Sequence, residues 1–169
     1  NDYDYWRQLG NVGWSWEDVL PYFKKSEDFQ FGENEFHGSG GPIKVEKIRA
    51  TFKVLDLFLE AAEEFGYKKT DDFNSGSNEG MGYFPLTVKN GFRCSTAVGY
   101  LNPVKKRKNL KVITNAHIKN IEFENKKAKC VNYWLNNNLV KVKTNKEIIL
   151  SAGTIGSPHI LQASGIGPG

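Results

Sequence analysis

The sequence contains few residues of the kinds that form metal or disulfide sites, and it has no long apolar run. No stretch of about 18 apolar residues occurs in its 169 residues, so we predict no membrane span. The two cysteines, Cys94 and Cys130, are too few for a disulfide framework or a cysteine-ligated zinc site. The three histidines, His37, His117 and His159, lie far apart without metal-ligand spacing. We therefore predict no metal site.

Aromatic side chains are abundant, and charge is unevenly distributed. Four Trp, seven Tyr and eleven Phe are far more than a disordered chain carries, so we expect a packed core. Residues 1–84 have nine Lys and Arg against sixteen Asp and Glu, whereas residues 85–169 have fourteen against three. The basic half, which includes the run Lys105–Lys108, is typical either of a surface that binds a polyanion or of a solvated lysine-rich surface.

Local signals near the start of the chain predict two short helices. Ser15 is a candidate N-cap, because the carboxylate of Asp18, three residues later, can accept a hydrogen bond from the Ser15 backbone N–H. Pro21 cannot continue a helix without the loss of a hydrogen bond. We therefore expect Pro21 to begin a second helix that ends near Asp28.

Residues 52–65 have the clearest helical pattern, with apolar side chains on one face and acidic ones on the other. The side chains predicted to be buried are Phe58 and Leu59, and those predicted to be exposed are Glu60 and Glu64. Gly66 is well placed to end this helix in the left-handed conformation.

The remaining elements are mostly strands, and together they predict a mixed α/β fold. The predicted strands are residues 42–48, 83–88, 110–114, 118–124, 130–135, 139–143 and 147–150, and short helices are predicted up to Leu101 and over residues 157–164. The apolar strand 147–150 leads through Ser151-Ala152-Gly153 into the last helix. This order of elements can hold a nucleotide phosphate or ribose, although it also occurs in proteins without a ligand.

Residues 153–167 read GTIGSPHILQASGIG, which matches every constrained position of the second signature of the glucose–methanol–choline (GMC) oxidoreductases. Other segments agree with the family in order and spacing: Asp4–Trp6, Gly13–Trp16, Leu20–Glu27, His37–Pro42, Gly91–Ala97 and Leu110–Ile118. The chain thus resembles a GMC oxidoreductase over essentially its whole length, and in particular the insect glucose-dehydrogenase-like branch.

The resemblance implies a domain organisation. Residues 1–40 would be a helical extension of a FAD-binding Rossmann-like domain, and residues 41–90 would be part of a substrate domain with an antiparallel sheet and helices. Residues 91–169 would be part of the FAD-binding domain, including the second signature. The Gly-x-Gly-x-x-Gly turn of the family is absent, and its catalytic His is expected beyond Gly169. We therefore expect an internal piece of a longer enzyme, inactive by itself.

The resemblance also implies an activity and three cofactor-binding residues. FAD would take a hydride from the CH–OH group of an alcohol or sugar, and an electron acceptor would then reoxidise it. The backbone of Ile118 would contact the adenine, and Ala152 and Gly153 would lie near the adenosine. The resemblance suggests a secreted protein, but the sequence itself leaves the compartment open.

Two other functions are compatible with the sequence. The basic half suggests a module that binds nucleic acid or another polyanion. However, the aromatic residues cluster in the acidic half, and stacking surfaces for nucleic acid require basic and aromatic side chains to be interleaved. We therefore predict no nucleic-acid partner. The third possibility is a non-catalytic remnant of a GMC enzyme.

Overall fold

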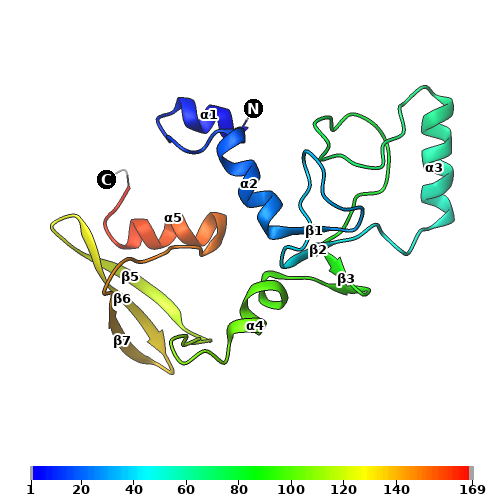
Figure 1. The fold of residues 1–169 in the computed structure, drawn as a ribbon. Coiled ribbons are helices and arrows are strands. Elements are labelled where there is room, and N and C mark those ends of the chain that lie inside the picture. The colour runs from blue at the N-terminus through cyan, green and yellow to red at the C-terminus, as the bar shows by residue number, and fades with distance from the viewer. Residues whose placement is uncertain (1, 168–169) are drawn as a thin grey trace. The chain divides into compact units, whose positions relative to one another are not determined.

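The computed structural model describes residues 2–167 (Figure 1). The chain divides into two compact units, residues 1–110 and residues 111–169, which we call unit 1 and unit 2. Both units contain helices and strands, which confirms the predicted mixed α/β fold. Within the described part of the chain, no helix is both long enough and apolar enough to cross a membrane.

Unit 1 begins with two helices, α1 (Asp2–Gln8) and α2 (Trp16–Ser26). The predicted cap of α2 is confirmed, because Ser15 Oγ accepts from the Asp18 N–H at 3.3 Å and Asp18 Oδ2 accepts from the Ser15 N–H at 3.0 Å. The prediction that Pro21 begins a second helix is wrong, since α2 continues through Pro21. Pro21 is the sixth of the eleven residues of α2, and its missing N–H removes the hydrogen bond to the Glu17 carbonyl.

Unit 1 also contains two small sheets. β1 (Glu27–Phe29) pairs in parallel with β2 (Ile43–Val45), and β3 (Val88–Lys89) pairs antiparallel with β4 (Phe92–Arg93). The strand predicted over residues 42–48 is therefore shorter than expected, and the one predicted over residues 83–88 is wrong except at its last residue, Val88. Beyond them, a single antiparallel bridge joins Glu46 to Leu86. Side chains and loops, rather than long ladders, must therefore hold much of unit 1 together.

A short helical segment ends unit 1. It consists of the π-helical turn η1 (Ala97–Leu101) and the short helix α4 (Asn102–Val104), where the sequence predicts a short helix. The basic residues Lys105–Lys108 follow in an exposed loop.

Helix α3 (Lys53–Glu64) confirms the helix predicted over residues 52–65. Gly66 has φ +99° and its N–H bonds the Glu63 carbonyl, so it ends the helix in the left-handed conformation as predicted. Glu60 and Glu64 are exposed, as expected. The predicted burial is wrong for Phe58, which is 58% exposed, and Leu59 is only half-buried. The physical reason is that α3 packs against few described residues, so that Ala62 is its one buried side chain among them.

Unit 2 contains a three-stranded antiparallel sheet in the order β5-β6-β7. The strands are β5 (His117–Glu124), β6 (Lys127–Leu135) and β7 (Asn138–Lys143), which confirms three of the predicted strands. Two-residue turns connect them, at Asn125-Lys126 and Asn136-Asn137, and all four residues have positive φ between 49° and 64°. Turns of this kind match the twist of the strands that they join.

Helix α5 (Gly153–Ala163) packs against β5 in unit 2 (Figure 1). It begins four residues earlier than the helix predicted over residues 157–164. The strands predicted over residues 110–114 and 147–150 are wrong, because neither segment forms a strand in the structure. The apolar residues Ile148-Ile149-Leu150 suggest a buried strand, but a short apolar run forms a buried strand only where other strands lie on both sides of it. Ile149, the middle residue of this run, is 80% exposed.

Candidate cofactor-binding site

The turn before α5 contains two of the three predicted cofactor-binding residues, Ala152 and Gly153, although the strand predicted to lead into it does not form. Ala152 is the N-cap of α5, with φ −88° and ψ 12°. Gly153 follows with φ +85°, and a Cβ on it would meet no heavy atom within 4 Å among residues 2–167, apart from its chain neighbours. Glycine is required here because of its positive φ rather than because of close packing within unit 2. The N–H groups of the first helical turn have no acceptors within α5, which suits an anion.

Two residues in the first turns of α5 keep this turn in place. The Oγ of Ser157 accepts a hydrogen bond from the Ala152 N–H at 2.9 Å, and so satisfies a donor just outside the helix. A Cβ on Gly156 would lie 3.2 Å from the Cβ of Ala152, which is tighter than ordinary packing. The turn and the helix therefore approach each other closely at position 156, and a larger residue there would require Ala152 to move by a few tenths of an ångström.

Ile118 lies on β5, the edge strand of the sheet that α5 contacts. It is half-buried and pairs with Tyr133 on β6. The register shifts between Ile118 and Asn120, so Lys119 forms a β-bulge next to Ile118. A bulge redirects the backbone on either side of it and is common next to functional sites. Unit 2 thus carries all three predicted cofactor-binding residues, two at the start of α5 and one on β5.

The end of α5 is also well defined. Gly165 has φ +80°, its N–H bonds the Gln162 carbonyl, and the Ile166 N–H bonds the Leu161 carbonyl. These two bonds form a Schellman motif, which satisfies the last carbonyls of the helix. The position of Gly165 in the sequence signature therefore has a physical explanation, because only glycine adopts this conformation without strain.

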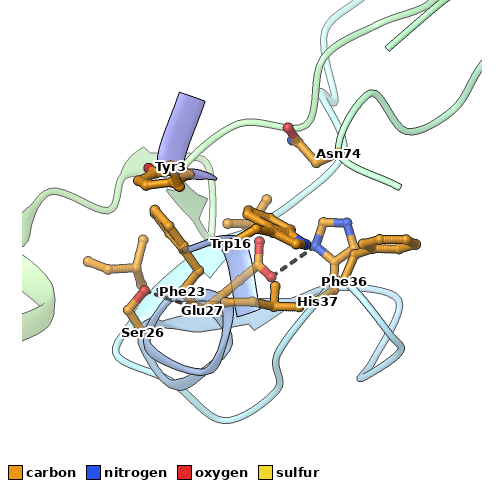
Figure 2. A pocket seen from close by; sticks show the side chains of 11 residues that line it. Tyr3, Trp16, Phe23, Ser26, Glu27, Phe36, His37 and Asn74 are labelled. Carbon is orange, nitrogen blue, oxygen red and sulfur yellow. Dashed lines mark hydrogen bonds and ion pairs between the residues drawn. The ribbon is translucent and has the colours of Figure 1, made fainter. Parts of the chain in front are cut away.

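Unit 1 contains a cavity of about 360 Å³ whose lining includes four aromatic side chains (Figure 2). Its lining residues are Tyr3, Trp16, Leu20, Phe23, Ser26, Glu27, Phe36, His37, Ile43, Val45 and Asn74. Figure 2 shows the carboxylate of Glu27 beside the imidazole of His37 at one wall.

His37 is the most buried titratable side chain of this wall, at 3% exposed. Its Nδ1 lies 2.9 Å from Glu27 Oε2, and its Nε2 lies 2.9 Å from Asp72 Oδ2. The ring also stacks on Phe29, with the centroids 3.8 Å apart. His37 thus joins the end of α2 and β1 to the loop that contains Asp72.

The other two histidines have no comparable surroundings. His117 is exposed at the start of β5, and His159 is exposed on α5. Within residues 2–167, no group of three or more His, Cys, Asp or Glu side chains is arranged to hold a metal ion.

Ion pairs in both units shift the pKa values of surface groups. In unit 1, hydrogen bonds from the Lys44 ammonium at 2.9 Å and from the Gly40 N–H lower the pKa of Asp28. In unit 2, the Lys141 ammonium and the Asn132 amide donate to Glu122 and lower its pKa. The Glu122–Asn132–Lys141 contacts join all three strands of the sheet.

Comparison with known proteins decides the family. The model of the family described as GMC oxidoreductase matches residues 1–169. The chain belongs to the GMC oxidoreductase family. It is 45% identical over 172 residues to the oxygen-dependent choline dehydrogenase of Proteus mirabilis (strain HI4320), an alignment that covers 99% of this chain and 31% of that protein. The corresponding identity to the enzyme of Pseudomonas fluorescens (strain SBW25) is 41%, over 99% of this chain and 30% of that one.

Two solved structures of oxidases and oxidoreductases have the same fold over this region. The chain superposes on pyridoxine 4-oxidase from Mesorbium loti with a TM-score of 0.89 at 28% identity, covering 99% of this chain and 33% of that one. It superposes on a FAD-dependent oxidoreductase from Chaetomium thermophilum with a TM-score of 0.85 at 32% identity, covering 99% and 32%. The GMC chain thus spans about a third of the length of these proteins.

Several residues of this GMC chain have roles that sequence reasoning missed. Glu27 and Asp72 flank His37, but they lie 10 and 35 residues away from it, so no local pattern indicates them. Gly38 and Gly41 lie in the segment His37–Pro42, where the sequence gives no reason for glycine at these two positions beyond the family resemblance. In the structure, a Cβ on either would overlap the backbone of Lys24 or of residues 26–27, so the close approach of these segments requires glycine.

Proposed function

We propose that this chain is part of a FAD-dependent oxidoreductase that acts on the CH–OH group of an alcohol or sugar. The observation that carries the proposal is the complete second GMC signature over residues 153–167, folded as a helix that follows a left-handed glycine. When bound, FAD would accept the hydride from the substrate carbon. The residues of this chain would bind and orient the adenosine part of the cofactor.

The backbone groups of unit 2 at the start of α5 and next to the bulge on β5 are suited to bind an adenine nucleotide. Gly153 leaves the backbone at the start of α5 open to close approach, and the helix terminus there favours negative charge. Ile118 lies next to a bulge, where backbone groups are less fully used by the ladder. We propose that Ile118 contacts the adenine through its backbone and that Ala152 and Gly153 lie against the adenosine. We assign none of the three histidines as the catalytic base.

The substrate and the domain assignment are further parts of the proposal. The identity to choline dehydrogenases and the structural similarity to pyridoxine 4-oxidase favour a small primary alcohol as substrate, with a separate electron acceptor. A member of the insect glucose-dehydrogenase branch would prefer a sugar instead. We propose that residues 41–90 belong to the substrate domain, and that residues 1–40 and 91–169 belong to the FAD-binding domain.

Replacement of Gly153 tests the cofactor site. In the complete enzyme, Gly153→Leu should abolish FAD binding, because its side chain would lie where backbone and nucleotide are close. Gly10→Leu is a matched control, since Gly10 has φ +97° and likewise no heavy atom within 4 Å of its Cβ position, but lies in unit 1. Flavin absorbance of the purified variants measures occupancy. Full occupancy in Gly153→Leu, or equal loss in both variants, would contradict the assignment.

A panel of alcohols tests the activity. The wild-type enzyme should reduce an artificial acceptor with choline, pyridoxine, an aryl alcohol or glucose as donor, and the ranking of these donors would separate the branches of the family. An enzyme without flavin, or without turnover on any of them, would contradict the proposed function.

A further inference from the structure

Ser164, the residue that ends α5, bonds the free edge of the sheet. Its Oγ accepts a hydrogen bond from the Ile121 N–H at 2.7 Å and donates one to the Ile160 carbonyl at 2.6 Å. Ile121 is 5% exposed, and β5 is an edge strand with β6 on its other side. The Ser164 hydroxyl is therefore the acceptor for a buried N–H group that the ladder leaves unpaired.

This bond is not needed to cap the helix. The Schellman motif at Gly165 and Ile166 already satisfies the carbonyls of Leu161 and Gln162. The accepting side of the Ser164 hydroxyl is directed at another element, β5. The bond therefore fixes the end of α5 to the strand that carries Ile118, three residues before Ile121 in the chain.

The bond between Ser164 and Ile121 constrains β5 close to the bulge at Lys119. Lys119 interrupts the pairing of β5 with β6 directly after Ile118, so the ladder constrains the backbone there less than elsewhere. The Ser164 bond at Ile121 supplies a constraint on the other edge of the strand, on the far side of the bulge. At the other end of α5, the Ser157 hydroxyl holds the turn that contains Ala152. The two signature serines thus tie the helix to the two segments proposed to contact adenosine.

We propose that Ser164 is a positioning residue for the adenosine part of FAD, which fixes the backbone of Ile118 relative to the turn at Gly153. The proposal rests on the proposed function, because it presumes that these two segments contact the nucleotide. Ser164 itself need not touch the cofactor. Its hydroxyl lowers the conformational freedom of β5 next to the bulge. The nucleotide therefore has a smaller entropic cost to overcome in ordering this backbone when it binds.

The test uses the complete enzyme with Ser164→Ala, Ser164→Cys and Ser164→Thr. Alanine removes the hydroxyl, cysteine keeps nearly the same volume but accepts hydrogen bonds weakly, and threonine retains the hydroxyl. Ser26→Ala is the matched control, since Ser26 also ends a helix and donates to its own helix at the Phe23 carbonyl, but bonds no other element in the described residues. The dissociation constants for FAD and for ADP, which shares the adenosine half, are measured on the apoenzyme by calorimetry.

Ser164→Ala and Ser164→Cys should each raise the dissociation constants for FAD and for ADP by the same factor of about ten, as expected when a buried N–H loses its acceptor. Ser164→Thr and Ser26→Ala should bind both as the wild type does. At saturating FAD, kcat should be unchanged in every variant, because the substrate side is untouched. Hydrogen exchange of the β5 peptide should increase in the apoenzyme of the alanine and cysteine variants only.

Three results would overturn the proposal. Faster exchange of β5 with unchanged affinity for both nucleotides would show that the bond serves the fold alone. Weaker binding of FAD with unchanged binding of ADP would show that Ser164 affects the flavin half of the cofactor and not the adenosine half. If Ser164→Ala does not fold, wild-type affinity for both nucleotides in Ser164→Cys would show that the hydroxyl does not position the cofactor contact. A wild-type enzyme that binds neither nucleotide would instead contradict the proposed function itself, which these variants do not affect.

Discussion

Unit 1 and unit 2 are stabilised in different ways. Unit 2 has strands of eight, nine and six residues that are joined in order by two-residue turns, with one helix packed against β5. Unit 1 has strands of two or three residues, and many of its contacts join distant segments. The contact of His37 with Asp72 spans 35 residues. A sheet with local connections depends on turn geometry, whereas an irregular unit depends on individual buried side chains.

The comparison predicts that single polar substitutions damage unit 1 more than unit 2. His37→Ala should reduce the free energy of unfolding by about 3 kcal/mol, because it leaves two carboxylates facing each other around a cavity. His117→Ala, at an exposed position of unit 2, should change it by less than about 0.5 kcal/mol. Urea denaturation of the complete enzyme, with proteolysis to locate the first unit to open, measures both. Equal effects of the two substitutions would refute the difference between the units.

In unit 2, we expect substitutions to reduce stability most when they fall in the two-residue turns between the strands. Asn137 has φ +62° in the turn between β6 and β7, a conformation that Asn tolerates and β-branched residues avoid. Asn137→Val should therefore cost about 1 kcal/mol, whereas Asn137→Gly should be neutral or slightly stabilising. Asn145→Val, outside the turns with positive φ, is the control. Thermal melting would detect the difference, and a valine variant as stable as the glycine variant would show that turn geometry does not limit unit 2.

The smallest expected effect concerns acid stability in unit 1. The hydrogen bond from Lys44 is the main cause of the lowered pKa of Asp28. Because the folded pKa is lower than the unfolded one, the resulting stabilisation is present above about pH 3.9 and is lost as the pH falls through the folded pKa. Asp28→Asn should remove this dependence of stability on pH, which amounts to less than about 1 kcal/mol for a half-buried ion pair near the surface.

Denaturation midpoints at pH 7 and pH 3 measure this contribution. Asp71→Asn serves as the control, since the Asp71 carboxylate is 80% exposed and lies 3.6 Å from the Lys47 ammonium. The wild-type protein should lose more stability on acidification than Asp28→Asn does. Identical pH dependence in the two proteins would exclude a contribution from the Asp28–Lys44 pair.

The same contrast explains which features could be predicted from the sequence. Strands β5 to β7 and their turn at Asn136-Asn137 follow from local alternation and turn residues, and Ser15 and Gly66 follow from capping rules. The exposure of Phe58 could not be predicted, because burial depends on which segments lie opposite the helix. The partners of His37 could not be predicted either, since sequence patterns do not specify contacts between distant loops.

The location of the candidate cofactor site could be predicted from the sequence, but its detailed geometry could not. The signature located the turn at Gly153 and the helix after it, and the structure adds its positive φ. The bulge at Lys119 and the bond from Ser164 to β5 depend on how the helix packs on the sheet, and no residue pattern encodes that geometry directly. The contacts of Ile118, Ala152 and Gly153 with adenosine remain predictions.

The bond between Ser164 and Ile121 has one more consequence, for association between chains. The open edge of a sheet can recruit a strand from another molecule and so begin aggregation. A strand that approached β5 would have to displace the Ser164 hydroxyl and move the end of α5 away. At the opposite edge, β7 carries Lys141 and Lys143, whose charges oppose the addition of another lysine-rich strand. The same serine that we propose to position a cofactor contact therefore also protects the sheet from intermolecular pairing.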